Sequence, residues 1–292
     1  MFFTIAILST IGYSVQSTLM ASYYRRMDRL SAVAYRGLSL GITMMPLLLF
    51  VPRGQFGRVI SFLPHLGAAS FVAALANWCM ANAYSFLPVG IASALTMSFT
   101  AVVVVLLGFI FLAESLTGVQ LCFIGLILAG VVVLGVIRSS GPLPREYSVR
   151  RGVINSIVFG LLIGVAFSLI GSVSRQLDPF LAGYSWELII GVLAICAAVL
   201  RRAMGGAPLQ RLSARETLKI SLYCAPTAAG TGLFALATTM GAVGIVSAIM
   251  SSIMVFNTLF AFLLYREKLT LGQWSVLAFI CSMVIGLRVT LN

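Results

Sequence analysis

Charged side chains are scarce in this chain of 292 residues, at 9%, and only 7 of them are Asp or Glu. A soluble domain carries about 25% charged residues. So few charges cannot cover a water-facing surface, and 60% of the residues are hydrophobic. We therefore expect lipid to be the main solvent. Continuous apolar runs of about 20 residues, the length of a helix that crosses a bilayer, favour helices over a β-barrel.

The sequence also has little that would indicate an enzyme. His65 is the single histidine, and the five cysteines fall inside apolar runs without a metal-type spacing. We interpret the cysteines as small buried side chains. The sequence has neither a nucleotide-binding Walker motif nor a His-Glu metal motif, so we predict no catalytic residue, no metal ion and no cofactor. A membrane-embedded enzyme and a channel are the less favoured alternatives, because a catalytic constellation and a filter motif are missing.

Apolar runs separated by polar residues predict an all-α polytopic membrane protein with ten transmembrane helices. The predicted spans are 2–22, 31–51, 60–86, 89–112, 117–137, 152–174, 180–200, 217–239, 243–264 and 269–290. The Gly-, Pro- and Arg-containing segment 138–151 is predicted to be a cytoplasmic linker. It would join a first five-helix half, 1–137, to a second, 152–292.

The placement of the basic residues gives a predicted orientation. Most of the 19 Lys and Arg residues lie in the loops after the first, fifth, seventh and ninth predicted spans. Because basic loops stay in the cytoplasm, both termini are expected on the periplasmic side. The same placement accounts for the net charge of +12 without a nucleic-acid partner. The expected partners are a small-molecule solute and the lipid bilayer, and we expect a monomer.

The chain contains an internal repeat, in which the fourth and ninth predicted spans have similar sequences. Val89-Gly90-Ile91 matches Val243-Gly244-Ile245, and further on Glu114, Thr117 and Gln120 match Glu267, Thr270 and Gln273. Apolar composition alone raises similarity, but a shared Glu-x-Leu-Thr followed by Gln is specific. Since five is an odd number of spans, the second copy would enter the membrane in the opposite sense. Inverted repeats of this kind are a recurrent basis for alternating access around a site near the midplane.

These residues resemble the drug/metabolite transporter superfamily, EamA type. Its members carry two five-helix repeats, each with a Glu, a Leu-Thr or Leu-Ser pair, a Gln and a Gly-rich fifth helix. Gly125 and Gly130 continue this pattern in the first half, whereas the second half has largely lost the corresponding glycines. Arg36 also fits, because an Arg in the second helix is common in the family.

More narrowly, the chain is similar to bacterial exporters of the YddG type. This resemblance implies a multi-pass protein of the bacterial inner (plasma) membrane that exports aromatic or other neutral amino acids by alternating access. Other neutral metabolites or drugs, such as nucleoside- or purine-like compounds, are the alternative substrates.

Polar side chains at helical spacing predict a shared cavity, because polar groups are costly in lipid and tend to face the bundle interior. The alternative is that the hydroxyl groups bond to their own helix or join neighbouring helices. The candidate cavity residues are Tyr13, Gln16, Asn77, Trp78, Tyr84, Thr96, Trp186, Glu187, Thr231, Thr238, Ser251 and Asn257.

Four charged residues receive separate interpretations. Arg36 and Glu187 lie within predicted spans, where an ionised group is a functional candidate, although each is close enough to a span end for its charge to reach the interface. Glu187 would attract a substrate ammonium group or carry a coupling proton. Glu114 and Glu267 are expected to be structural, near the N-termini of the fifth and tenth spans, where the helix dipole favours negative charge.

Overall fold

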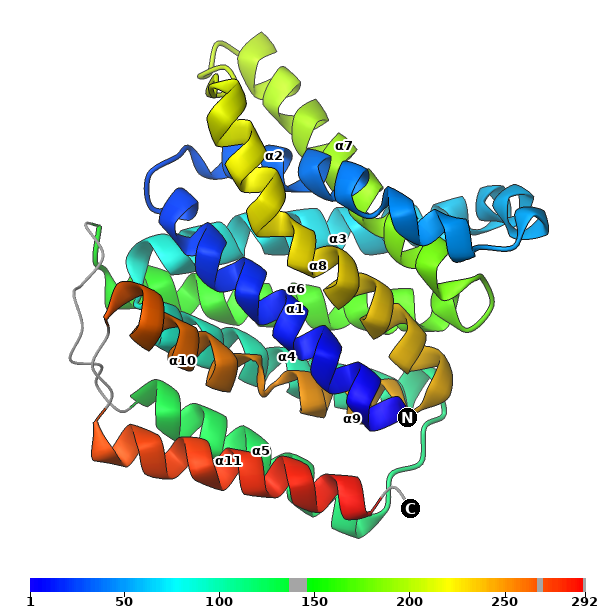
Figure 1. Cartoon of the computed structure of the whole chain (residues 1–292), viewed down its shortest axis with the longest axis vertical. Helices are drawn as coiled ribbons and strands as arrows, with labels where there is room; N and C mark the ends of the chain where they lie inside the picture. The colour runs from blue at the N-terminus through cyan, green and yellow to red at the C-terminus, as the bar shows by residue number, and fades with distance from the viewer. Residues whose placement is uncertain (137–145, 267–269, 291–292) are drawn as a thin grey trace.

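The computed structural model describes residues 1–136, 146–266 and 270–290, and these residues form helices without a strand (Figure 1). Two short 3-10 helices, η1 (Met45–Phe50) and η2 (Arg53–Arg58), precede α3. The α-helices are α1 (Phe2–Tyr24), α2 (Arg29–Thr43), α3 (Val59–Phe86), α4 (Val89–Phe111), α5 (Gly118–Val136), α6 (Val149–Ser174), α7 (Pro179–Ala203), α8 (Ala214–Met240), α9 (Val243–Met250), α10 (Ile253–Tyr265) and α11 (Leu271–Val289).

The described residues confirm the predicted all-α fold, and the length and apolar character of the helices suit membrane spans. Within the described residues, 8 helical stretches are long and apolar enough to cross a membrane. Two shorter apolar helices, Gly118–Gly130 and Leu271–Leu287, lie in α5 and α11. Ten complete spans in an inverted arrangement therefore stay a prediction.

Two predicted spans are interrupted. The span predicted at 243–264 is split into α9 and α10, because Ser251 and Ser252 occupy a turn in which their hydroxyls bond back to Ser247 O (3.1 Å) and Ile249 O (2.6 Å). Such bonds compete with the regular helix ladder. The span predicted at 31–51 leaves the α-helix at Thr43 and continues as η1, whose Pro46 has no N–H to donate.

The predicted linker at 138–151 is only partly covered, since 137–145 lie outside the described residues. Its last residues already belong to α6, which begins at Val149 rather than at residue 152.

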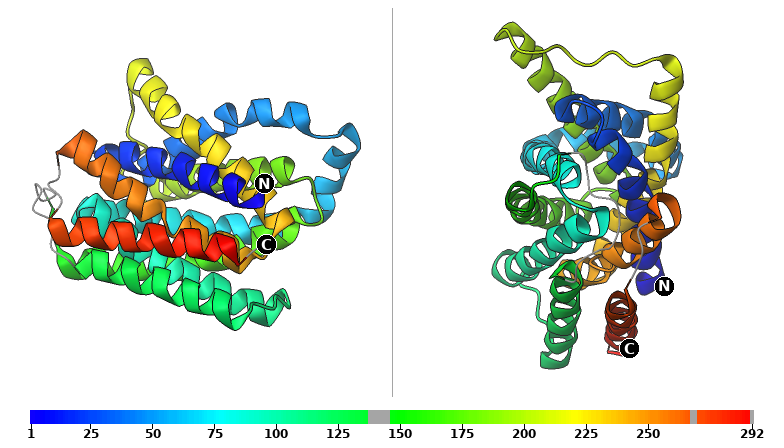
Figure 2. Two further views of the ribbon diagram at one scale, coloured as in Figure 1. Left: turned by 60° about the horizontal axis from the view of Figure 1, so that its bottom comes forward. Right: turned by 90° about the vertical axis from the view of Figure 1, so that its left-hand side faces the viewer.

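The two halves of the chain interlock instead of forming separate bodies. The most extensive helix contacts join α3 with α6, α1 with α8, α4 with α6, and α2 with α7, and each of these pairs takes one helix from each half. The pair of α5 and α11 lies side by side at one edge of the bundle (Figures 1 and 2). The space between the halves is therefore enclosed by helices from both.

The sequence repeat corresponds to a repeated local structure at the start of α5 and α11. The Thr117 N–H donates to Gln120 Oε1 (3.0 Å), and the Gln120 N–H donates to Thr117 Oγ1 (3.3 Å). Thr270 and Gln273 make the same reciprocal pair at 2.9 and 3.3 Å. This arrangement is a capping box, which satisfies N–H groups that the first turn leaves unpaired.

The crossing of α2 and α7 depends on two glycines in direct backbone contact. A Cβ on Gly37 would lie 2.3 Å from Gly191 Cα, and a Cβ on Gly191 would lie 2.8 Å from the Gly37 carbonyl carbon. Small residues let membrane helices approach this closely. Gly37 and Gly191 are also separated by the same interval as Val89 and Val243, so the helices cross at equivalent positions of the repeat.

We expect Gly37→Ala and Gly191→Ala each to lower the free energy of unfolding by about 1–3 kcal/mol, because the added methyl forces the two backbones apart. Thermal unfolding in detergent would measure the loss. Gly67→Ala in α3 is the matched control, since no atom outside the local helix backbone lies within 4 Å of its added Cβ. Equal stability of the three variants would contradict the account of the crossing.

Candidate functional site

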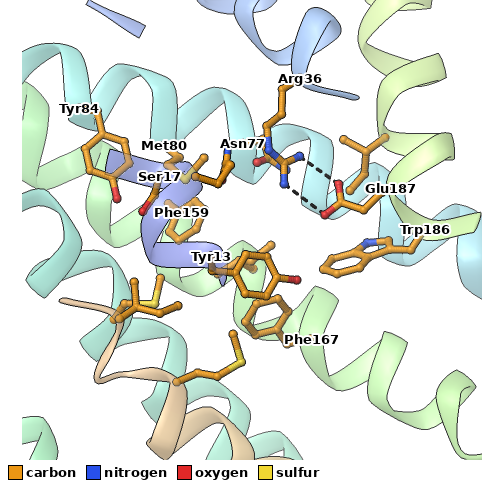
Figure 3. Close-up of a pocket in the computed structure, with 16 residues that line it drawn as sticks. Tyr13, Ser17, Arg36, Asn77, Met80, Tyr84, Phe159, Phe167, Trp186 and Glu187 are labelled. Carbon is orange, nitrogen blue, oxygen red and sulfur yellow. Dashed lines mark hydrogen bonds and ion pairs between the residues drawn. The ribbon is translucent and has the colours of Figure 1, made fainter. Parts of the chain in front are cut away.

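A cavity lies in the middle of the bundle, between helices of both halves (Figure 3). The space open to the centres of water molecules is about 60 Å³, which is room for several waters. The lining residues are Tyr13, Gln16, Ser17, Arg36, Asn77, Met80, Tyr84, Met97, Phe159, Ile163, Phe167, Trp186, Glu187, Ile190, Met250 and Ile253.

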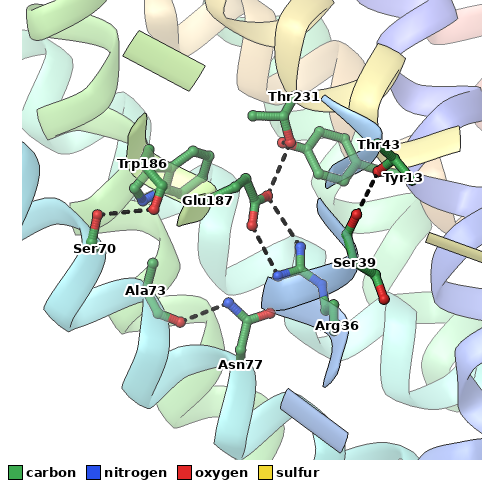
Figure 4. Close-up of polar contacts among 10 residues, drawn as sticks. All are labelled: Tyr13, Arg36, Ser39, Thr43, Ser70, Ala73, Asn77, Trp186, Glu187 and Thr231. Carbon is green, nitrogen blue, oxygen red and sulfur yellow. Dashed lines mark hydrogen bonds and ion pairs between the residues drawn. The ribbon is translucent and has the colours of Figure 1, made fainter. Parts of the chain in front are cut away.

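An ion pair between Arg36 and Glu187 forms the polar centre of this cavity (Figure 4). Arg36 Nη1 donates to Glu187 Oε2 at 3.0 Å, and Nη2 donates to Oε1 at 3.1 Å. Their side chains are 5% and 2% exposed. The interpretation that these charges reach the membrane interface is therefore wrong: both turn inward and neutralise each other. Arg36 directly precedes Gly37, so the close crossing of α2 and α7 also brings Arg36 within hydrogen-bonding distance of Glu187.

A chain of hydroxyl groups supports the Glu187 carboxylate from the opposite side (Figure 4). Thr231 Oγ1 donates to Glu187 Oε1 at 3.0 Å. The Tyr13 hydroxyl lies 2.8 Å from Thr231 Oγ1. Because Thr231 has given its only proton to the carboxylate, Tyr13 must be the donor in this second bond. The carboxylate thus receives hydrogen bonds from α2 and α8, and indirectly from α1.

Apart from Gln16, Ser17 and Asn77, the remaining wall is rich in aromatic, Met and Ile side chains. Phe167 packs edge-on against Trp186, with ring centroids 5.9 Å apart, and also against Phe234 at 4.5 Å. Met80 and Met250 lie at other sides of the cavity. Met side chains are unbranched and adapt to irregular shapes. The cavity therefore combines one neutralised pair of charges with a deformable apolar wall.

The buried donors beside the cavity that have no acceptor among the described residues include Arg36 Nε and Trp186 Nε1. An unsatisfied buried donor costs about 1–3 kcal/mol. Both residues line the cavity, so water or the acceptor group of a bound solute can supply the missing partner.

A second polar cluster around Asn257 joins α1, α4 and α10. Asn257 Oδ1 accepts from Ser14 (2.6 Å), Ser17 (2.9 Å) and Thr18 (3.1 Å), and Asn257 Nδ2 donates to Ser93 Oγ at 2.6 Å. This arrangement is the helix-joining role that polar residues have in membranes. Asn257 therefore acts behind the cavity wall, through its contact with the lining residue Ser17.

The structure brings together half of the predicted cavity residues. Those that line the cavity are Tyr13, Gln16, Asn77, Tyr84, Trp186 and Glu187. Thr231 and Asn257 bond to lining residues from behind. Whether any of them binds a solute stays a prediction.

The other four predicted residues do not reach the cavity. The hydroxyls of Thr96, Thr238 and Ser251 bond to carbonyl groups of their own helix, at Ala92 O, Ala235 O and Ser247 O. Trp78 is 48% exposed and lies in an outer groove with Phe71 and Leu75. It faces away from the cavity because it is one helical step from Asn77, which lines it.

Sequence reasoning missed most of the apolar lining. Phe159, Ile163 and Phe167 share one face of α6 at intervals of four residues. The spacing was readable, but α6 is apolar all round, so periodicity gave no signal for which face meets the cavity.

Glu114 occupies a different position from the one predicted. It was expected to cap its own following helix, α5, but its carboxylate accepts from the N–H groups of Val243 (2.7 Å) and Gly244 (3.1 Å) at the start of α9. Glu114 therefore lies at a helix N-terminus, as predicted, but at that of α9 and not of α5. Glu267 lies outside the described residues.

Replacing only one partner of the central pair should cost more stability than replacing both. Glu187→Leu leaves the Arg36 charge buried without its counter-ion, and we expect the free energy of unfolding to fall by about 3–5 kcal/mol. The double variant Arg36→Leu/Glu187→Leu leaves no buried charge and should lose less. Thermal unfolding of the detergent-purified variants would compare them. A double variant less stable than Glu187→Leu would contradict the pairing.

Comparison with known proteins finds a family model that matches the first half of the chain and a solved structure that shares the fold of nearly all of it. The model of the EamA-like transporter family matches residues 2–136. No curated protein matches the chain. A solved structure described as "Crystal structure of protein" is similar to it, with a TM-score of 0.66 over 96% of this chain and 94% of that chain. At 15% sequence identity, this likeness shows the fold alone. Residues 2–136 are therefore similar to the EamA-like transporter family, whose members transport small solutes across membranes.

Proposed function

We propose that the chain is a secondary transporter that exports small amphipathic metabolites, with aromatic or other neutral amino acids as the favoured substrates, by alternating access. One observation carries the proposal: the buried Arg36–Glu187 pair faces a cavity with aromatic and Met walls, enclosed by both halves of the chain. The EamA-like domain supports the transport of a small solute.

The charges of the cavity favour a zwitterionic solute. Arg36 offers a guanidinium group to a carboxylate, and Glu187 offers a carboxylate to an ammonium group. The unsatisfied Arg36 Nε and Trp186 Nε1 are further donors for a carboxylate. Because the two residues compensate each other, a solute with both charges leaves the site neutral. A polyanion would bring charge that a single Arg cannot balance.

The walls favour an apolar side chain on that solute. Phe159, Phe167, Trp186 and the Tyr13 ring offer aromatic surfaces, which pack with another ring in offset or edge-on geometry. A neutral nucleoside- or purine-like compound would also pack on these rings. It would not need both charges, and this difference separates the two substrate classes.

Alternating access is supported by the repeated geometry of the halves. The capping boxes of α5 and α11 and the crossing of Gly37 with Gly191 relate equivalent positions. Repeats that are inverted in the membrane can exchange conformations around a central site. The basic loops favour periplasmic termini in a bacterial inner membrane, and this orientation is part of the proposal.

Purified protein in liposomes should exchange labelled phenylalanine against unlabelled phenylalanine, with saturation. Glu187→Gln should lower this exchange by about tenfold or more, because the ammonium group loses its counter-charge. Glu216→Gln is the matched control: it changes the same chemical group at an exposed capping box, which Gln can also complete. Equal loss in both variants would contradict a specific role for Glu187.

A substrate panel would separate the alternatives. Faster exchange of a labelled purine nucleoside than of phenylalanine would favour the second substrate class. Flux that neither saturates nor shows counter-exchange would indicate a channel instead.

A further inference from the structure

A cluster of polar contacts ties three loops together at the end of the bundle that holds the N-terminus. Its centre is Glu114, whose side chain is 8% exposed. The carboxylate accepts from Arg175 Nη2 at 2.6 Å, and from the N–H groups of Val243 and Gly244. In the same region, a Cβ on Gly241 would lie 2.7 Å from the Phe2 ring. We call Glu114, Arg175 and the start of α9 the clasp.

The backbone around Glu114 is shaped to deliver its carboxylate. Ala113 has a φ of 50°, in the left-handed region that costs a non-glycine residue energy. The Glu114 N–H returns to Gly108 O at 3.1 Å, which closes the end of α4. A Cβ at Gly108 would lie 2.8 Å from Glu114 Oε2. A strained turn and an absent side chain thus both favour this one position of the carboxylate.

Arg175 extends the clasp across the turn between α8 and α9. Its Nε donates to Thr238 O at 3.0 Å and its Nη2 to Gly241 O at 3.2 Å. Arg25, at the end of α1, makes the same bonds to Tyr84 O (3.1 Å) and Leu87 O (3.4 Å) before α4. Arg25 and Arg175 therefore fasten the equivalent turn in each half.

The layer between the clasp and the cavity is fully buried. Ile170 and Val246 have an exposed fraction of 0%. Further inward, Phe167 and Met250 line the cavity, about 12 Å from Arg175 along α6 and about 9 Å from Gly244 along α9. The elements that the clasp ties together are thus continuous with walls of the cavity.

We propose that the clasp is the gate of the cavity at this end of the bundle: Glu114 and Arg175 must separate before a solute can pass. The gate rests on the proposed transport function, because it closes the cavity proposed to hold the solute. The exposure of Arg175 allows the clasp to open. The Arg175 side chain is 31% exposed, so water can take over its hydrogen bonds.

The test uses the rate at which a cavity residue is labelled from each side of the membrane. Ser17→Cys would be introduced after the five native cysteines are replaced by alanine, and a membrane-impermeant maleimide applied to vesicles of either orientation. With the clasp intact, labelling from the Glu114 side should be slow. Glu114→Gln and Arg175→Met should each raise it at least threefold, with little change from the opposite side. Glu216→Gln should leave both rates unchanged.

Arg175→Met is the milder variant, since Glu114 keeps its bonds to α9, and size-exclusion profiles would confirm that each variant is folded. Three results would overturn the gate: fast labelling from the Glu114 side with the clasp intact, unchanged labelling in folded clasp variants, or an equal rise from both sides. Labelling needs no transported substrate. If the protein shows the gated labelling and no transport, the proposed transport function is contradicted and the proposed gate is not.

Discussion

The contact of Gly37 with Gly191 is the constraint on which the centre of this protein depends. It brings α2 and α7 into backbone contact, and the residues beside it place Arg36 opposite Glu187. Burying two charges is costly unless their geometry is close and their remaining hydrogen-bonding groups are satisfied. Thr231 and Tyr13 complete the shell of Glu187 from α8 and α1. Four helices, two from each half, are thus held to one carboxylate.

Local periodicity explains how far the sequence predicts this site. Tyr13 and Gln16 share a face of α1, and Asn77 and Tyr84 share a face of α3, so both pairs were found from spacing alone. The meeting of Arg36 with Glu187 was not predicted, because it joins residues 151 apart through a helix crossing that no local pattern specifies. Glu114 shows the same limit: its position predicted an N-terminal cap, while the tertiary structure supplied a different helix.

The helices themselves were predictable where composition is decisive and less so where a few polar groups act. Long apolar runs predict long apolar helices, and the described residues contain 8 that are long enough to cross a membrane. The division of α9 from α10 depends on two hydroxyls that bond to their own backbone. Serine bonds in this way inside many unbroken helices as well, so sequence alone does not say which serine pair will end one.

The pair of α5 and α11 has a consequence for how such a chain can diversify. None of the described residues that line the cavity comes from either helix. The two are joined to each other, and Gln120 Nε2 donates to Thr290 O across them at 3.3 Å. The two helices pack against each other, and α5 also packs against α4, away from the cavity. Relatives that bind different solutes can therefore retain this pair nearly unaltered, while selection for a new solute acts on the helices that line the cavity.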